Sequence, residues 1–282
     1  AWTPAKIAAE RDANTWDARA AAILAGVQAR RGAVSDVAVI LAGVPIDDSG
    51  GGQRPAQLAL ELLARGWRVV YVQKYPKQEH RELGLTIAHP RLETCDLSAF
   101  DVAGYLGDRP TGRLIAVAEL PHPDFEPALA ALRARGAKLA YDLIDDWATS
   151  LGGDWYDAAC EDRIAAMSHA LVASARDLVT GLEARTGRPV ALVPNAVNRR
   201  LFDRTKPWPR PADLPVGAPQ ILYIGALWGE WFDWGLVKAV AEAHPQAAVT
   251  LIGDYAGHCP YPPPPNLRFL GLKAQAALPA YL

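Results

Sequence analysis

Three consecutive glycines, Gly50, Gly51 and Gly52, are the first residues of the sequence whose type and position can do chemistry. They follow an apolar stretch at residues 37–42, expected to be a buried strand, and they open a helical pattern. Unpaired backbone N–H groups and the helix dipole favour an anion at such a helix N-terminus, so the loop is a candidate phosphate site. Its spacing matches neither the G-x-G-x-x-G signature nor a P-loop, which leaves a flexible turn as the alternative.

A group of carboxylates ends another expected strand. Asp142 lies near the end of the apolar stretch at residues 138–143, and Asp145 and Asp146 follow it directly. Clustered carboxylates at the end of a strand can bind Mg²⁺. Asp is also common where a strand meets a loop or a helix cap, and we favour a substrate-binding or structural role over a metal site.

Further polar side chains are candidates for contacting a ligand. His122 follows the apolar stretch at residues 114–118, at the edge where parallel sheets bind ligands, so contact with an acceptor is one of its possible roles. Asn195 ends an expected strand and can either satisfy its own turn or reach a ligand. Arg199 and Arg200 are nearby basic residues that can neutralise phosphate, although such a pair is more often simply solvated.

Aromatic residues gather in the second half of the chain. Trp228, Trp231 and Trp234 recur at intervals of three around Glu230. Trp228 and Trp231 can stack on a base or a sugar ring, or the group can be the start of a helix that packs on its own domain. Gly225 precedes them, and its missing side chain would let a ligand come close to the backbone.

These candidates lie among alternating strands and helices. Strands are expected at residues 37–42, 68–73, 114–118, 138–143, 170–174 and 190–193, and helices at residues 53–65, 123–135, 156–168 and 175–186. Gly66, Gly136 and Gly187 fall where three of these helices should end. Continuous apolar strands separated by helices predict a doubly wound parallel α/β sheet covered on both faces.

The chain divides into four expected parts. Residues 1–34 read as a helix with an apolar face, which can dock on the following domain or contact a partner domain or a membrane surface. Residues 35–205 form the first Rossmann-like domain, and the proline-rich residues 206–219 form a semi-rigid linker. In residues 220–282 the alternation restarts, with strands at 220–224, 248–252 and 267–270 and helices at 232–243 and from Ala274.

Composition narrows the classes of function. Lys and Arg (29) nearly balance Asp and Glu (31), so no strong field attracts nucleic acid. Cys95, Cys160 and Cys259 form no C-x-x-C pair, which argues against a disulfide framework or a zinc site and indicates a reducing cytoplasm. The longest apolar run is too short to cross a membrane, which leaves contact with its inner face open. The lone methionine, Met167, and the end at Leu282 within a helical pattern suggest a piece of a longer polypeptide.

Several segments, in a common order, match one known enzyme family. Residues 50–70 (GGGQRPAQLALELLARGWRVV) look like its glycine loop, helix and second strand, and residues 141–147 (YDLIDDW) look like the Y-D-x-I-D-D-W element of a bacterial subgroup. Residues 169–174 (HALVAS) and 193–197 (VPNAV) resemble the strand and turn before the domain crossing, and residues 223–227, 230–233 and 265–271 resemble the start of the nucleotide-binding domain. The chain thus resembles the retaining family 4 glycosyltransferases, group 1 type, of the GT-B fold.

The resemblance implies two Rossmann-like domains that face a cleft, the second of them incomplete. It implies metal-independent transfer of a sugar from a nucleotide-sugar donor, with no other cofactor, to a glycan or lipid-linked acceptor, as in the synthesis of a bacterial surface polysaccharide. Catalysis is assigned to His122, Asp145 and Asp146, donor binding to Gly50, Gly51, Gly52, Asn195, Arg199, Gly225, Trp228 and Glu230, and no residue to a metal.

Two features of the family are not in this stretch of sequence. Residues 225–234 hold no Arg or Lys to neutralise the donor diphosphate, and the family's pair of donor-binding glutamates would lie beyond Leu282. The stretch therefore does not complete a donor site by itself. The alternative is a non-catalytic glycosyltransferase-like module that serves as a scaffold or binds sugar nucleotides within a larger protein.

Overall fold

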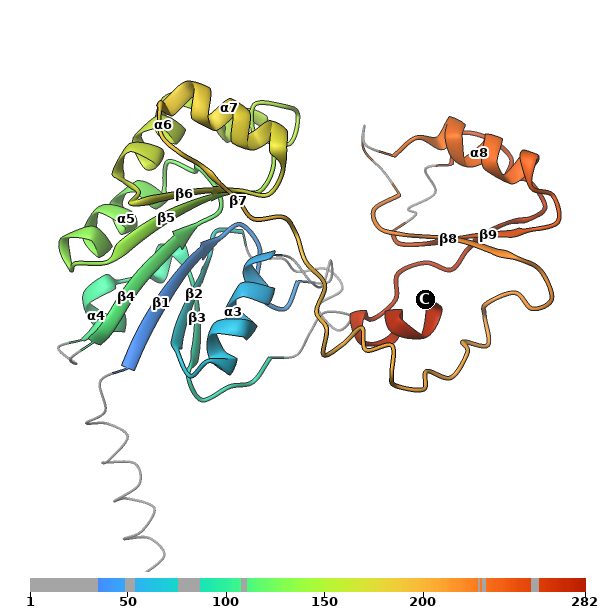
Figure 1. Cartoon of the computed structure of the whole chain (residues 1–282), viewed down its shortest axis with the longest axis horizontal. Helices are drawn as coiled ribbons and strands as arrows, with labels where there is room; N and C mark the ends of the chain where they lie inside the picture. Colours follow the sequence, from blue (N-terminus) through green and yellow to red (C-terminus); the bar gives the residue numbers. More distant parts are fainter. Residues whose placement is uncertain are drawn as a thin grey trace, which may run out of the picture.

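A computed structural model describes residues 35–48, 54–75, 87–107, 111–227, 229, 232–254 and 259–282. The helix expected over residues 1–34 and the glycines Gly50, Gly51 and Gly52 lie outside these residues. Figure 1 shows two α/β units, each built on its own sheet and joined by an extended segment.

The first unit is built on a seven-stranded sheet in the order β3-β2-β1-β4-β5-β6-β7. Every pairing in it is parallel. Its strands are β1 (Ser35–Ala42), β2 (Arg68–Gln73), β3 (Leu92–Asp96), β4 (Thr111–Ala118), β5 (Lys138–Leu143), β6 (Ala170–Ala173) and β7 (Ala191–Leu192). The strand order reverses between β1 and β4, and the carboxyl edge of a parallel sheet at such a point is where α/β folds bind ligands.

Helices cover both faces of this sheet (Figure 1). α3 (Arg54–Ala64) packs on one face, and α4 (Val102–Leu106), α5 (Phe125–Ala134), α6 (Ala158–Met167) and α7 (Arg176–Thr186) pack on the other. Alternate residues of β1 divide accordingly: Val39 and Leu41 join the core under α4–α7, whereas Ile40 and Ala42 join the core under α3. The continuous apolar strands therefore reflect a sheet buried on both faces, and the predicted doubly wound architecture is confirmed.

Glycines end three of the helices, as predicted. Gly66 and Gly136 have φ of 85° and Gly187 has φ of 65°, in the left-handed region that favours glycine. The N–H of Gly187 donates to the carbonyl of Glu183 at 2.8 Å and so closes α7. These sharp endings return the chain to the amino edge of the sheet for the next strand.

Two elements of the first unit, β3 and α4, are absent from the sequence-based expectation. β3 lies at the sheet edge and its residues are half-buried or exposed, so it has no continuous apolar run to reveal it. α4 is a single short turn of helix, with Asp101 capping its N-terminus through bonds from the N–H groups of Ala103 and Gly104.

The second unit holds a three-stranded parallel sheet in the order β10-β9-β8. It consists of β8 (Gln220–Ile224), α8 (Trp234–Ala243), β9 (Ala248–Ile252) and β10 (Leu267–Phe269), with a core around Leu227, Phe232 and Leu251. The helix expected from Ala274 is instead a 3₁₀ helix, Gln275–Tyr281, with Pro279 inside it. Proline has no N–H to donate to an α-helical ladder, which explains the difference.

Two glycines bring the ends of β8 and β9 together. A side chain on Gly253 would place its Cβ 1.8 Å from the carbonyl oxygen of Gly225. Gly253→Ala is therefore expected to lower the free energy of unfolding of the second unit by about 1–3 kcal/mol, measured by urea denaturation.

Gly181 provides the matched control for this substitution. It lies inside α7 with no atom within 4 Å of a built Cβ, so Gly181→Ala should stabilise the chain by about 0.5–1 kcal/mol. Equal effects of the two substitutions would show that the close approach at Gly253 is not essential.

Candidate functional site

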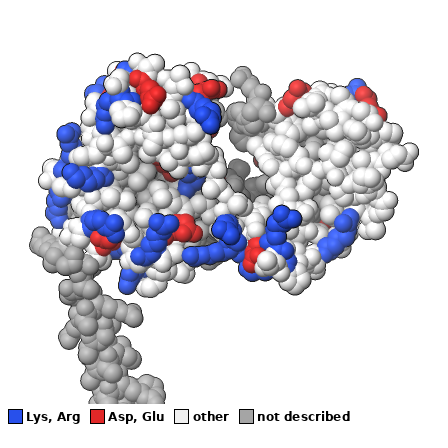
Figure 2. Space-filling view, in the orientation of Figure 1, with Lys and Arg blue, Asp and Glu red and all other residues white. Residues whose placement is uncertain are grey.

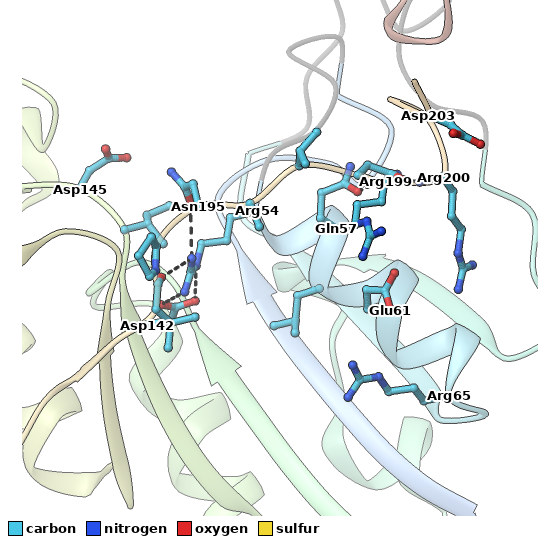
Figure 3. A pocket seen from close by; sticks show the side chains of 17 residues that line it. Arg54, Gln57, Glu61, Arg65, Asp142, Asp145, Asn195, Arg199, Arg200 and Asp203 are labelled. Carbon is cyan, nitrogen blue, oxygen red and sulfur yellow. Dashed lines mark hydrogen bonds and ion pairs between the residues drawn. The ribbon is translucent and has the colours of Figure 1, made fainter. Parts of the chain in front are cut away.

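A groove of about 990 Å³ opens at the carboxyl edge of the first sheet (Figure 3). It lies between α3, the end of β5 and residues 193–203, the segment that leaves β7 toward the second unit. Of the 17 residues that line it, 11 are polar or charged: Arg54, Gln57, Glu61, Arg65, Asp142, Asp145, Asn195, Asn198, Arg199, Arg200 and Asp203. Figure 2 shows a hollow between the two units in the same molecule.

Arg54, the first residue of α3, joins three parts of the groove. Its Nε donates to Oδ2 of Asp142 at 2.7 Å and its Nη2 to Oδ1 at 2.9 Å, which makes a bidentate ion pair. Its Nη1 donates to the carbonyl of Val193 at 2.7 Å and lies 3.4 Å from Oδ1 of Asn195. Arg54 thus fixes the N-terminus of α3 to the end of β5 and to the segment that leaves the first unit.

The wall along α3 is made of planar polar groups. Asn198 donates from its side chain to Oε1 of Gln57 at 2.9 Å, and its own Oδ1 accepts from the N–H groups of Arg200 and Leu201. Asp145 lies at the opposite wall, in Figure 3 across Asn195 from α3, and partial burial raises its pKa above the usual range. Hydrogen-bond donors and acceptors therefore lie next to one another along the groove.

Beneath the groove lies a buried carboxyl group, Glu119, in the residue that follows β4. Its side chain is 1% exposed, and burial, together with the nearby Asp142, raises its pKa well above the usual range. It belongs to the same face of the sheet as Asp142 and Arg54.

His122 is held in an aromatic cluster next to the end of β4. Its ring stacks on Trp155, with centroids 5.3 Å apart, and meets Tyr75 edge-on at 5.9 Å. Its Nδ1 accepts a hydrogen bond from the backbone N–H of Asp124 at 3.1 Å. Burial, with a smaller contribution from the charged Lys74, lowers its pKa below the usual range. The ring is therefore neutral, with its proton on Nε2, and it can donate a hydrogen bond but cannot accept a proton there.

The structure does not bring all of the sequence-predicted site residues together. Asp145, Asn195 and Arg199 line the groove together. His122 lies in its own cluster at the same sheet edge, and Asp146 holds a turn by accepting from the N–H of Ala148. Gly225 belongs to the second unit, whereas Gly50, Gly51, Gly52, Trp228 and Glu230 lie outside the described residues. The catalytic and donor-binding roles assigned to all of these residues stay predictions.

Arg54, Gln57 and Glu119 were missed by the sequence reasoning. Arg54 and Asp142 are 88 residues apart, and neither carries a local signal of the other. Glu119 did carry a signal, because an acidic residue directly follows the apolar strand 114–118 at the edge where ligands bind.

The described residues also bear on metal and membrane contacts. Within the described ranges, no three His, Cys, Asp or Glu side chains come close enough together to hold a metal ion. The carboxylate of Asp142 is bound by Arg54 instead. The same part of the chain has no helix that is long and apolar enough to cross a membrane. All three cysteines are free thiols.

Comparison with known proteins identifies the fold. No protein-family profile matches the sequence, and no curated protein is significantly similar to it. Among solved structures, the α-glucosyltransferase AGT in complex with UDP aligns over 88% of this chain and 71% of its own, with a TM-score of 0.57 and 9% identity. WaaG, a glycosyltransferase involved in lipopolysaccharide biosynthesis, aligns over 86% of this chain and 72% of its own, with a TM-score of 0.49 and 12% identity. With its two parallel sheets, the chain has the GT-B fold.

Proposed function

We propose that this chain is a glycosyltransferase that transfers a sugar from a nucleotide-sugar donor to a glycan or lipid-linked acceptor, with retention of configuration and without a metal ion. The observation that carries the proposal is the polar groove at the carboxyl edge of the first sheet in a chain with the GT-B fold. AGT, which shares the fold, binds UDP, and we infer that a nucleotide occupies the second unit here.

The donor is assigned to the carboxyl edge of the second sheet. Gly225 and Gly253 end β8 and β9 there, and neither has a side chain to keep a nucleotide from the backbone. Trp228 and Glu230, which follow in the sequence, are proposed to contact the base and ribose, and the amides of Gly50, Gly51 and Gly52 are proposed to contact the diphosphate.

The acceptor is assigned to the groove. Its arginine, carboxylate and amide groups nearly balance in charge, and such a mixture suits the hydroxyl groups of a sugar, each of which both donates and accepts. This proposal therefore moves Asn195 and Arg199 from the donor-binding role expected from the sequence, and Asp145 from its expected catalytic role, to binding of the acceptor. The groove lies on the first unit, beside the segment that leads to the second.

The state of His122 sets its part in the reaction. Because charge accumulates on the leaving diphosphate, donors fixed before the reaction lower the barrier. The Nε2–H of His122 is such a donor, held in place by Asp124 and Trp155. Since Nε2 already carries a proton, it cannot take the proton of the acceptor hydroxyl. We propose that this proton goes to the departing diphosphate oxygen, which is present in every transfer from a nucleotide sugar. No metal is needed for this chemistry.

The groove assignment predicts the effect of removing its arginines. Arg199→Ala combined with Arg200→Ala is expected to raise the KM for the acceptor about tenfold with little change in stability, because both side chains are exposed and charged hydrogen bonds would be lost. Arg133→Ala combined with Arg176→Ala, exposed arginines on α5 and α7, is the matched control. Equal KM values in the two double variants would contradict the groove as the acceptor site.

Calorimetric titration tests the function itself. The chain is titrated with UDP, GDP and ADP and with their sugar derivatives, and we expect saturable binding of one nucleotide series. Binding without any consumption of the sugar nucleotide would favour the alternative, a non-catalytic sugar-nucleotide-binding module. Absence of binding in all series would contradict both.

A further inference from the structure

The strand pairing of the first sheet places Glu119 in a buried position. In the register of the sheet, Ala118 pairs with Leu41 of β1 and with Tyr141 of β5, so Glu119 is next to Ala42 and Asp142. Ala118 and Tyr141 point into the core under α4–α7. Since side chains alternate along a strand, Glu119 and Asp142 point to the opposite face, toward the start of α3.

The ionisable groups near Glu119 come from four parts of the first unit. Asp142 belongs to β5, Asp145 to the loop after it and Arg54 to α3, and from β2 the buried Tyr71 interacts with Glu119. Among these described groups Arg54 is the positive one, and its Nε and Nη2 are taken by the two oxygens of Asp142. Oε1 of Glu119 is buried without a hydrogen-bond partner among the residues described. Within the part of the chain that the structure describes, Glu119 therefore has no cation of its own.

We propose that Glu119 is a positioning residue of the transfer site: as an uncharged carboxylic acid it leaves Arg54 to Asp142, and Arg54 in turn holds residues 193–195 against the first sheet. That this site transfers a sugar rests on the proposed function. The arrangement of Glu119, Asp142 and Arg54 does not depend on that function. The burial that raises the pKa of Glu119 agrees with this state. If Glu119 were ionised, its carboxylate and that of Asp142 would compete for the guanidinium of Arg54. The hydrogen bonds from Arg54 to Val193 and Asn195 would then weaken.

The proposal fixes the sign of a pH effect on stability. A carboxyl whose pKa is higher in the folded than in the unfolded chain binds more protons when folded, so its contribution to stability is lost as pH rises. The loss begins near the ordinary value of 4.5 and continues up to the raised pKa of Glu119. In that window the unfolding equilibrium constant increases about tenfold per pH unit for one proton.

Urea unfolding from about pH 5 to pH 8 tests this claim on the wild-type chain and on Glu119→Gln. We expect the ratio of unfolding constants, wild type over variant, to rise with pH by up to about tenfold per unit. Glu126→Gln is the control, because pairing with Arg163 lowers the pKa of Glu126 and its ratio should be constant above about pH 5. A constant or falling ratio for Glu119→Gln would overturn the proposal.

A second measurement covers the case in which Glu119→Gln does not fold. The infrared band of a protonated carboxyl is expected in the folded wild-type chain at neutral pH and should vanish when urea unfolds it. Absence of that band in the folded chain would overturn the proposal.

Trypsin cleavage after Arg199 and Arg200 reports the positioning itself. Both residues are exposed and lie just beyond the segment that Arg54 holds. At and above the pH at which the ratio of unfolding constants levels off, which marks the ionisation of Glu119 in the folded chain, the ratio of cleavage rates, wild type over Glu119→Gln, should increase several-fold. An unchanged ratio would show that Glu119 does not act through Arg54. None of these measurements uses a nucleotide sugar, so a failure of the proposed function would not affect them.

Discussion

Replacing Arg54 by glutamine is expected to lower the free energy of unfolding by about 3–5 kcal/mol. The substitution leaves Asp142 as a buried charge without its partner, since the side chain of Asp142 is 7% exposed and that of Arg54 is 16% exposed. Breaking such a pair on one side costs far more than the pair itself contributes, because the remaining carboxylate is only poorly hydrated. Urea denaturation followed by tryptophan fluorescence measures the change.

An exposed ion pair of the same geometry is the control. Arg163 also makes a bidentate pair, with Glu126, but its side chain is 53% exposed, so Arg163→Gln should cost less than about 1 kcal/mol. Adding Asp142→Asn to Arg54→Gln should recover part of the loss, because no unpaired charge then stays buried. An Arg54→Gln variant as stable as Arg163→Gln would contradict the role given to this pair.

His122→Ala is expected to lower kcat about 100-fold, whereas His122→Gln should stay within about tenfold of the wild-type rate. Alanine removes the donor, but the amide nitrogen of glutamine can occupy a place similar to that of Nε2 and still donate. KM for the donor should change less than kcat, since the bond strengthens as charge develops on the leaving group. Steady-state rates with the nucleotide sugar identified by calorimetry provide the test.

The two substitutions separate a donor from a base, because glutamine can donate a hydrogen bond but cannot take up a proton. Because burial and Lys74 lower the pKa of His122, although the carboxylate of Asp124 opposes them, the ring is neutral at pH 7 and above. Activity should therefore not change with pH through His122 above about pH 7, and it should fall only at acidic pH, where Nδ1 would lose its bond from Asp124. A His122→Ala rate equal to that of the wild type, or a His122→Gln rate as low as that of His122→Ala, would contradict the donor role.

The architecture of the first unit could be predicted because its strands are buried on both faces. Alternate side chains of the continuous apolar run from Val37 to Leu41 lie in two separate cores. A strand buried on both faces needs no polar residues, so its sequence shows an uninterrupted apolar run rather than alternation. The glycines after α3, α5 and α7 then marked the helix ends. The edge strand β3 could not be predicted from the sequence, because Leu92 and Cys95 are only half-buried and its other residues form no apolar run.

The site was predictable only in part, for a similar physical reason. Asp145, Asn195 and Arg199 stand at the ends of recognisable strands or just beyond, so the edge where ligands bind could be located. The pairing of Arg54 with Asp142 depends on how α3 crosses the sheet, and no local pattern encodes that crossing. The proton on Glu119 depends on the register of β4 with β5, which becomes known only from the strand pairing.

Release of nucleoside diphosphate from nucleotide sugars shows whether this chain is a glycosyltransferase. The chain is incubated with UDP-, GDP- and ADP-sugars, with and without simple glycan acceptors, and the products are quantified by mass spectrometry. We expect that one donor series is consumed without added metal and that His122→Ala reduces the rate about 100-fold. If no nucleotide sugar is bound or consumed under any of these conditions, the account of this chain as a glycosyltransferase is wrong.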